Sequence, residues 1–546
     1  MNPRKKRTAR SALFAILFSV ILAAWVSRLF AYVPQGRVYE NQDNAFNIYM
    51  FTDFREALGT GHWFPQWSTY IHNGLGDAIF GFYEPGFFYL ASLLPHRIEP
   101  LHAMGIAVFM ALVVGSFSMW HLIGSRFGPE SGVVAMTLFT LSTYAGTEIY
   151  VRGDYEELTA MMLLPLLLDT LLVWRDTHRL GWLVAASITG GALVVTHPIA
   201  LVVYMCLMLH IAVEDLVLQR RLSSAIQNGL PLFLGGMLAA FYWLPVILEW
   251  KLVRAQTVFS GFNLYSKHFV GIKTLLGRFS DSPNVVPVAL GPVLIAAAVL
   301  AALGVVIRRQ HWTGDQLTVV RLLLCVSALS GYLMVRFSTW IWIIFPMLQR
   351  FFPWRFLALL TMGLAGIGAT WFTGRYRKPI AGILVAAAFL AYPYHLPTNF
   401  LAVPLKQPSD LITLDYAQDE NNLSVPKGAH LSPPAPFPKI HTSTDACTIT
   451  NYRIGQSLLS ATVATTQGCV IDLPHYYFPG WSGSLNGLEV PLENDDGWIA
   501  VQFPAGGRGD LTLKYGGSPA RRMGLWISAV TGLLLAFCAG IDLLRR

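Results

Sequence analysis

The chain begins with a long apolar stretch, SALFAILFSVILAAWVSRLFAYV at residues 11–33, which follows the basic segment PRKKR at residues 3–7. As a helix, a stretch of this length crosses a hydrocarbon core of about 30 Å. The stretch is long and no small-residue cleavage pattern follows it, so we interpret it as an uncleaved first span rather than a signal peptide. The basic residues before it indicate a cytoplasmic N-terminus.

Similar apolar stretches recur along the chain, and the charged residues cluster in the gaps between them. Of the 546 residues, 54% are apolar and only 13% are charged, which argues against a set of soluble domains. The sequence therefore predicts an α-helical polytopic membrane protein with about 12 spans. Besides the first span, we expect them at approximately 101–123, 131–149, 157–174, 181–196, 198–216, 228–248, 286–307, 320–338, 355–373, 379–396 and 523–544.

One further apolar segment, IFGFYEPGFFYLASLLP at residues 79–95, is short and is interrupted by Pro85-Gly86. It is either a thirteenth span or a re-entrant or interfacial piece. If it does not cross, the basic loops fall on one side of the membrane, which satisfies the positive-inside rule and puts both termini in the cytoplasm. The same loops account for the net charge of +8, so we predict no nucleic-acid partner.

This topology leaves three segments on the outer side: loops 34–100 and 249–285, and a polar segment at 397–522. The polar segment starts as a proline-rich linker and alternates like β-strands from about residue 448. Its Asn486-Gly487 pair is a strong hairpin signal. We thus predict a transmembrane module at 1–396, a linker with a small extracytoplasmic β-sandwich-like domain at 397–522, and a C-terminal transmembrane helix at 523–546.

Two of the five cysteines, Cys447 and Cys469, lie in this polar segment. In an oxidising compartment they could form a disulfide, but their spacing alone leaves the question open.

The first outer loop combines charged and aromatic residues. Asp43 lies just past the first span, and a carboxylate held there could accept a proton from a hydroxyl nucleophile. The alternative is a solvated loop with aromatic anchors at the membrane interface.

Other candidate residues lie where spans meet the outer side. Arg152 and Glu157 belong to a run with four charges in six residues, which is either an ionic turn or a guanidinium that holds a phosphate. His197 is either a structural histidine or part of a site. Lys267 and Arg355 oppose the positive-inside rule, so they bind an anionic headgroup or pair with acidic residues.

Familiar signatures of soluble enzymes are missing from the sequence, including the P-loop, HExxH, the nucleophile elbow and paired-cysteine metal motifs. A nucleotide-driven mechanism is therefore not predicted, and no cofactor is required. The carboxylates could bind a divalent cation, but no spacing demands a metal.

Several short motifs occur together in a fixed order. They are QDN (42–44), REALG (55–59), WFPQW (63–67), FYEP (82–85), YVRGDYEELTA (150–160), THP (196–198), LAAFYWLPVILE (238–249), FPWRFL (352–357) and YFPGW (477–481). Together they resemble a bacterial membrane family labelled "6-pyruvoyl-tetrahydropterin synthase-related", which is similar to the GT-C superfamily of integral-membrane glycosyltransferases. Gln42 and Asn47 stand where members of that family often have histidine.

The resemblance implies a transferase that moves a sugar from a polyprenyl-phosphate donor to a glycan or lipid acceptor of the cell envelope. It implies an active face outside the bacterial cytoplasmic (inner) membrane and no need for ATP. The matching positions are Asp43 as base, Arg152 and Arg355 at the lipid phosphate, and Glu157 as the acidic residue of the RG motif. His197 and Lys267 would join the substrate site, and Trp63, Trp67 and Tyr83 could stack on sugars.

Two other functions remain open from the sequence. A lipid-linked glycan transporter would need a polar path through the spans, whereas intramembrane charges are few and Asp169 is the main one. A non-catalytic envelope-polymer assembly subunit would use the β-domain to bind a partner and would tolerate loss of Asp43.

Overall fold

The structure is a computed structural model that describes residues 3–34, 37–254, 264–276, 288–308, 312–370, 377–392, 400–402, 425–427, 441–442 and 447–545. Most of the predicted proline-rich linker and part of the 249–285 loop lie outside the described residues.

Helices dominate the first 400 residues. The α-helices are α1 (Pro3–Ser27), α2 (Asn44–Gly59), α3 (Ile71–Gly74), α4 (Gly86–Ser92), α5 (Pro100–Phe127), α6 (Pro129–Thr140), α7 (Thr143–Gly146), α8 (Tyr155–Thr177), α9 (Leu180–Thr196), α10 (Ile199–Ile211), α11 (Leu222–Leu238), α12 (Ala240–Glu249), α13 (Ile272–Leu276), α14 (Pro292–Arg308), α15 (Gly314–Met334), α16 (Thr339–Ile344), α17 (Leu357–Gly368), α18 (Arg377–Ala391) and α19 (Pro519–Leu544). Short 3-10 or π turns connect them: η1 (Arg28–Tyr32), η2 (Ile79–Gly81), η3 (Thr147–Arg152), η4 (Ala212–Leu218), η5 (Trp250–Leu252), η7 (Tyr265–Lys267), η8 (Arg336–Ser338), η9 (Pro346–Arg350) and η10 (Pro353–Phe356).

Six helices in the described residues are long and apolar enough to cross a membrane by themselves. They are Arg10–Tyr32, Pro100–Phe127, Tyr155–Thr177, Ile199–Leu218, Gly314–Met334 and Pro519–Leu544. A seventh span results if α11 and α12, which are bent by 70°, count as one. The membrane character is therefore clear, while the number of about 12 spans stays a prediction.

The remaining predicted spans are shorter or broken helices. The stretch predicted at 131–149 is divided into α6, α7 and the π-helical η3, and the stretch predicted at 228–248 bends where α11 meets α12. Within 79–95 the helix α4 has only seven residues. At 1.5 Å per residue α4 is too short to cross a hydrocarbon core, so this segment is not a thirteenth span.

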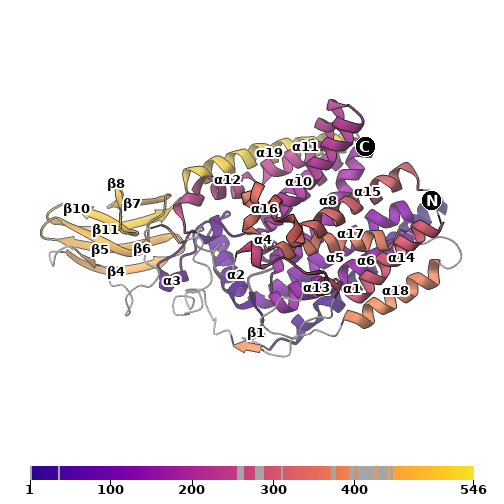
Figure 1. Cartoon of the computed structure of the whole chain (residues 1–546). Helices are drawn as coiled ribbons and strands as arrows, with labels where there is room; N and C mark the ends of the chain where they lie inside the picture. The colour runs from indigo at the N-terminus through magenta and orange to yellow at the C-terminus, as the bar shows by residue number, and fades with distance from the viewer. Residues whose placement is uncertain are drawn as a thin grey trace.

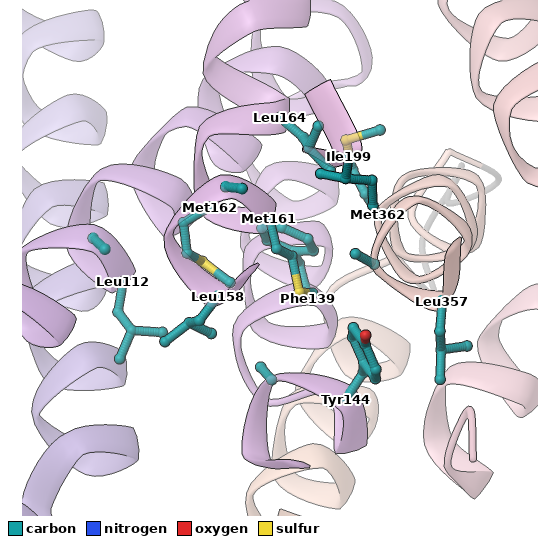
Figure 2. Packing of buried hydrophobic residues seen from close by; sticks show 14 of the residues in the cluster. Leu112, Phe139, Tyr144, Leu158, Met161, Met162, Leu164, Ile199, Leu357 and Met362 are labelled. Carbon is teal, nitrogen blue, oxygen red and sulfur yellow. The ribbon is translucent and has the colours of Figure 1, made fainter. Parts of the chain in front are cut away.

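The helices share one apolar core. Helix α8 packs against α5 and α9, and α17 packs against α15, α14 and α6. Figure 2 shows Phe139, Met161 and Leu357 filling the space between these helices, and all three are buried. This core holds the ends of α8, α10 and α17 in fixed positions relative to one another.

The predicted β-domain is present as two antiparallel sheets. One sheet has the order β3-β6-β10-β9 and the other β4-β5-β11-β7-β8. The strands are β3 (His441–Thr442), β4 (Cys447–Gly455), β5 (Leu458–Thr465), β6 (Cys469–Tyr476), β7 (Trp481–Leu485), β8 (Leu488–Val490), β9 (Leu492–Asp495), β10 (Trp498–Phe503) and β11 (Gly507–Tyr515). Apolar side chains of β5, β6, β10 and β11 form the core between the sheets.

Two local features of this domain test expectations that were drawn from the sequence. The pair Asn486-Gly487 joins β7 to β8 with positive φ at both residues, as the hairpin signal predicts. Cys447 on β4 and Cys469 on β6 form a disulfide, which links the two sheets and answers the question that their spacing left open.

The β-domain lies at one end of the helices and both chain termini lie at the other (Figure 1). It contacts the helical part through the first loop (residues 34–100) and through Trp250 and Val253, which follow α12. In the first loop, β1 (Arg37–Tyr39) pairs with β2 (Phe400–Ala402) of the linker. Trp67 is 1% exposed and packs against Trp481 and Tyr515, with ring centroids 5.3 Å from each. The backbone N–H of Tyr476 also donates to the carbonyl of Leu75 at 2.9 Å.

Replacing Trp67 by alanine should loosen this joint. The loss of a buried aromatic side chain costs about 3–5 kcal/mol, so we expect a lower unfolding temperature and new protease cleavage between the β-domain and the helices. Thermal unfolding and limited proteolysis of the purified protein measure both effects. The matched control is Trp63→Ala, because Trp63 is 72% exposed; equal effects of the two substitutions would contradict the role of Trp67.

Candidate active site

Two distant chain segments meet at the start of α2. The backbone N–H groups of Gln42 and Asp43 donate to the carbonyls of Val151 and Arg152, at 3.3 and 2.7 Å. Gly153, next along the chain, has φ 74°, and a Cβ there would lie 3.0 Å from the backbone nitrogen of Asn44. Glycine is therefore required at this position, where the turn Arg152-Gly153-Asp154, called the RGD turn below, packs against the first loop.

Asn47 strengthens this connection one turn into α2. Its side-chain amide donates to the carbonyl of Gly153 at 2.7 Å, and its amide oxygen accepts from the Tyr83 hydroxyl at 3.3 Å. Asn47 is fully buried. At this position, where histidine is common in the family that the sequence resembles, the residue therefore ties three segments of the chain together.

Arg152 is the centre of a buried ion cluster. It donates to Glu148, to Glu157 at 2.8 Å and to Asp154 at 2.6 Å, and the Asp43 carboxylate lies 3.9 Å away. On one side its guanidinium lies 4.6 Å from the ring centre of Trp354. The donors of Arg152 are thus largely used by carboxylates, as expected for an ionic turn rather than for a free phosphate ligand.

Arg355 shares the same carboxylates but is more accessible. Its side chain is 21% exposed and lies 3.4 Å from Glu157 and 3.5 Å from Asp154. It also contacts Nε2 of His197, whose Nδ1 accepts the backbone N–H of Ile199 at 3.2 Å. The five predicted residues Asp43, Arg152, Glu157, His197 and Arg355 therefore form one contiguous cluster.

Charge and burial set the protonation states in this cluster. Burial works to raise the pKa of Asp154, but the guanidinium groups of Arg152 and Arg355 outweigh burial and hold that pKa below its usual value. Burial, together with Arg355, lowers the pKa of His197 well below its usual value, so the imidazole is neutral at pH 7. The cluster thus keeps Asp154 charged and His197 uncharged.

Glu84 is a residue of this site that the sequence did not single out. It lies on the FYEP turn just before α4. At Gly86, the first residue of α4, a Cβ would lie 2.7 Å from the Cα of Thr196, so this turn is close to the THP motif. Burial raises the pKa of Glu84 to about 7, although nearby Arg355 lowers it. The FYEP motif was the available signal in the sequence, and in the fold the charges of Arg355 and Asp154 both act on the Glu84 carboxyl.

The other predicted residues lie in different surroundings. Tyr83 is half-buried beside the site. Burial and the negative charges of Glu156, Asp154 and Asp43 raise the pKa of its hydroxyl. Lys267 is exposed on η7, and the neighbouring His268 packs on Phe352 with ring centroids 4.2 Å apart.

The two tryptophans of the first loop do not join the cluster. Trp63 is exposed, and its carbonyl accepts a hydrogen bond from the Tyr89 hydroxyl at 3.0 Å. Trp67 is buried in the β-domain joint, so it offers no face to a ligand; the expectation that Trp67 stacks on a sugar is wrong.

One set of side chains in the described residues has a spacing that could hold a metal ion. Ligand atoms of Asp154, Glu157 and His197 lie within 4.8 Å of one another. The same carboxylates already accept hydrogen bonds or ion pairs from Arg152 and Arg355, however. A dication placed among two guanidinium groups would be repelled, so these residues do not fit a metal well.

The raised pKa of Glu84 makes stability depend on pH. The pKa is about 7 in the folded protein and about 4.3 in an unfolded chain, so the folded state binds more protons between these values. Stability contributed by the neutral carboxyl is present below about pH 4 and is lost as the pH rises through about 7. We expect Glu84→Gln to gain stability over the wild type as the pH rises from 5 to 8, measured by thermal unfolding. Exposed Glu489→Gln is the control, and a constant difference for Glu84→Gln would contradict the assignment.

Comparison with solved structures finds similar helical membrane proteins. The oligosaccharyltransferase AglB of Archaeoglobus fulgidus, in complex with an inhibitory peptide and a dolichol-phosphate, matches 71% of this chain and 56% of its own, with 12% identity and a TM-score of 0.40. ArnT from Cupriavidus metallidurans, bound to undecaprenyl phosphate, matches 69% of this chain and 78% of its own, with 14% identity and a TM-score of 0.29. The chain thus spans a little over half the length of the archaeal enzyme.

No curated protein matches the chain in sequence. Residues 80–397, more than half of the chain, match the family described as "6-pyruvoyl-tetrahydropterin synthase related domain; membrane protein". This region contains the FYEP, RGD, THP and PWR motifs that build the cluster around Arg152. The chain therefore belongs to the 6-pyruvoyl-tetrahydropterin synthase-related family of membrane proteins.

Proposed function

We propose that this protein is a glycosyltransferase of the bacterial cytoplasmic membrane. It would move a sugar from a polyprenyl-phosphate donor to a glycan or lipid acceptor of the cell envelope, on the extracytoplasmic face. The observation that carries the proposal is the charged cluster at the ends of three apolar helices, in which Asp43 and Arg355 are the partly exposed members.

An apolar pocket lies inside the helical bundle. Its walls come from α8, α10, α15 and α17: Leu164, Leu168, Val203, Cys206, Leu207, Val326, Leu359 and Met362. Figure 2 shows Leu164, Ile199 and Met362, from three of these helices, lying close together. With a volume of about 20 Å³ it has room for little more than one water molecule, so it is a small packing gap and not a site for a hydrocarbon chain.

Three of these four helices, α8, α10 and α17, begin at the charged site. Glu157 is in the first turn of α8, His197 precedes α10, and Arg355 precedes α17. Leu164 follows Glu157 by seven residues, which corresponds to about 10 Å along a helix. A ligand with a phosphate at Arg355 would therefore have its headgroup at the end of an apolar helical bundle, which favours a lipid phosphate over a soluble one.

The residues then have separate roles in a single displacement. The Asp43 carboxylate, 37% exposed and beside Arg152, would take the proton of the acceptor hydroxyl. The hydroxyl oxygen attacks the anomeric carbon as the bond from that carbon to the phosphate oxygen breaks, which inverts the anomeric centre. Arg355 offsets the charge that develops on the departing polyprenyl phosphate.

The structure changes the role that we give to Arg152. Because its donors already bind carboxylates, it is better suited to position Asp43 and Glu157 than to hold the phosphate. The phosphate then falls to Arg355, with His197 in contact with its guanidinium. No metal ion is needed for these steps.

A transporter fits the described residues less well. Asp169, the main charge predicted inside a span, pairs with Arg126 at 3.0 Å and with His121 at 2.6 Å. It lies about 18 Å along α8 from Glu157. A paired carboxylate far from the charged cluster gives no polar path across the bundle, which favours chemistry at one face.

Replacing Asp43 by asparagine tests the proposed base. We expect transfer to fall by about 10²- to 10⁴-fold while expression and unfolding temperature stay unchanged, because only the proton acceptor is lost. Mass spectrometry of surface glycans from a deletion strain and from an Asp43→Asn strain should show loss of the same sugar. Exposed Glu40→Gln is the matched control in the same loop. Retained transfer in the Asp43→Asn strain would support the assembly-subunit alternative instead.

Replacing Arg355 by lysine tests the phosphate site. Lysine keeps the charge but loses the planar fork of donors, so we expect KM for the lipid-linked donor to rise about 10-fold or more. Steady-state transfer in detergent or vesicles measures this effect, with exposed Arg453→Lys in the β-domain as control. An unchanged KM would remove Arg355 from the donor site.

A further inference from the structure

The segment between α15 and α17, residues 336–350, has an unusual surface for a connecting loop. It consists of η8, the six-residue helix α16 and η9, and it is called the lip below. Six large apolar side chains of the lip, Phe337, Trp340, Ile343, Ile344, Phe345 and Met347, are between 46% and 86% exposed. Such a dense exposed apolar patch marks a surface that is covered in the working protein.

The other face of the lip is packed next to the charged site. Trp342 is fully buried, with its ring stacked on Tyr265 at 5.2 Å and an edge contact with Phe356 at 5.8 Å. Phe356 follows Arg355 directly, and Lys267 lies two residues beyond Tyr265 on the same short turn. The lip therefore lies immediately beside Arg355, with the exposed ammonium group of Lys267 on an adjacent segment.

The ends of the lip have the composition of a membrane interface. Trp340 donates through its indole N–H to the Tyr332 hydroxyl at 2.8 Å, and that hydroxyl donates to the carbonyl of Phe337 at 3.2 Å. Arg336 begins the lip and Arg350 ends it, with the Arg350 guanidinium 4.0 Å from the ring centre of Trp250. Paired Trp and Tyr, and arginines with apolar stems, are typical of residues at the headgroup level.

The position of the lip indicates what covers it. The lip joins the ends of α15, which is long and apolar enough to span a membrane, and α17, which packs along α15. Figure 1 places α16 beyond the ends of α15 and α17 that face the β-domain. With six residues, α16 is too short to cross a bilayer, but it exposes Trp340, Ile343 and Ile344 at the end of a span.

We propose that the lip is inserted into the bilayer and forms the entrance through which a lipid with an anionic headgroup reaches Arg355 from within the membrane. The apolar face contacts acyl chains, while Lys267, Arg336 and Arg350 hold the headgroup near the interface. The identity of this lipid as the polyprenyl-phosphate donor rests on the proposed function. The location of the lip in the membrane does not.

Site-directed spin labelling tests the location directly. The free cysteines Cys206, Cys325 and Cys538 are replaced by alanine, and a nitroxide is attached to Trp340→Cys or Ile344→Cys in the full-length protein. In phosphatidylcholine–phosphatidylglycerol vesicles we expect high accessibility to oxygen and low accessibility to a water-soluble nickel chelate. Labels at Leu533→Cys on α19 and at Leu488→Cys on the β-domain hairpin, both exposed positions, provide the lipid and water references.

Two outcomes would overturn the proposal. Nickel accessibility equal to that of the Leu488 label would put the lip in water, and low accessibility to both reagents would put it against a protein partner.

A transfer assay tests the entrance. We expect the double substitution Ile343→Ser and Ile344→Ser to raise KM at least 10-fold for a long-chain polyprenyl-phosphate donor and to leave KM unchanged for a short-chain, water-soluble donor. An equal rise for both donors would overturn the lateral entrance. Absence of transfer by the wild type with either donor would instead refute the proposed function, while the spin labels would still report whether the lip lies in the membrane.

Discussion

The buried guanidinium of Arg152 is the interaction on which the rest of the site depends. A buried charge is tolerated only when opposite charges and hydrogen bonds surround it. Here Glu148, Asp154 and Glu157 supply them within hydrogen-bond distance, and Asp43 completes the ring at 3.9 Å. Because these residues come from α2, η3 and α8, satisfying one arginine fixes the relative positions of three segments.

The same requirement determines where the first loop lies. Its backbone pairs with the RGD turn at Gln42 and Asp43, and its helix α2 then runs for 16 residues, or about 24 Å, toward the β-domain. Along α2 the buried Asp53 accepts a hydrogen bond from Ser68, and the adjacent Trp67 packs against β7 and β11. One helix therefore connects the charged cluster with the joint of the β-domain.

The charged cluster lies next to two kinds of apolar surface, one buried inside the helical bundle and one exposed on the lip. Inside the bundle, buried apolar side chains fill the space between the helices that begin at Glu157, His197 and Arg355. Beside Arg355, the lip exposes apolar side chains on one face and buries Trp342 on the other. A lipid phosphate matches this combination, because its headgroup needs cations and its tail needs an apolar path. A soluble sugar phosphate would leave the lip without a role.

The amino-acid sequence determined the membrane class, the alternating strands, the Asn486-Gly487 hairpin and the candidate residues around Arg152, because each depends on local composition or spacing. Three matters were decided only by the tertiary structure. Trp63 and Trp67 are chemically alike, yet one is exposed and the other is buried against a domain more than 400 residues away. Glu84 lies within electrostatic reach of Arg355 and Asp154, although it is about 70 residues before Asp154 in the sequence. Arg152 is occupied by carboxylates whereas Arg355 is partly accessible, since burial and pairing arise from contacts between segments that no local pattern specifies.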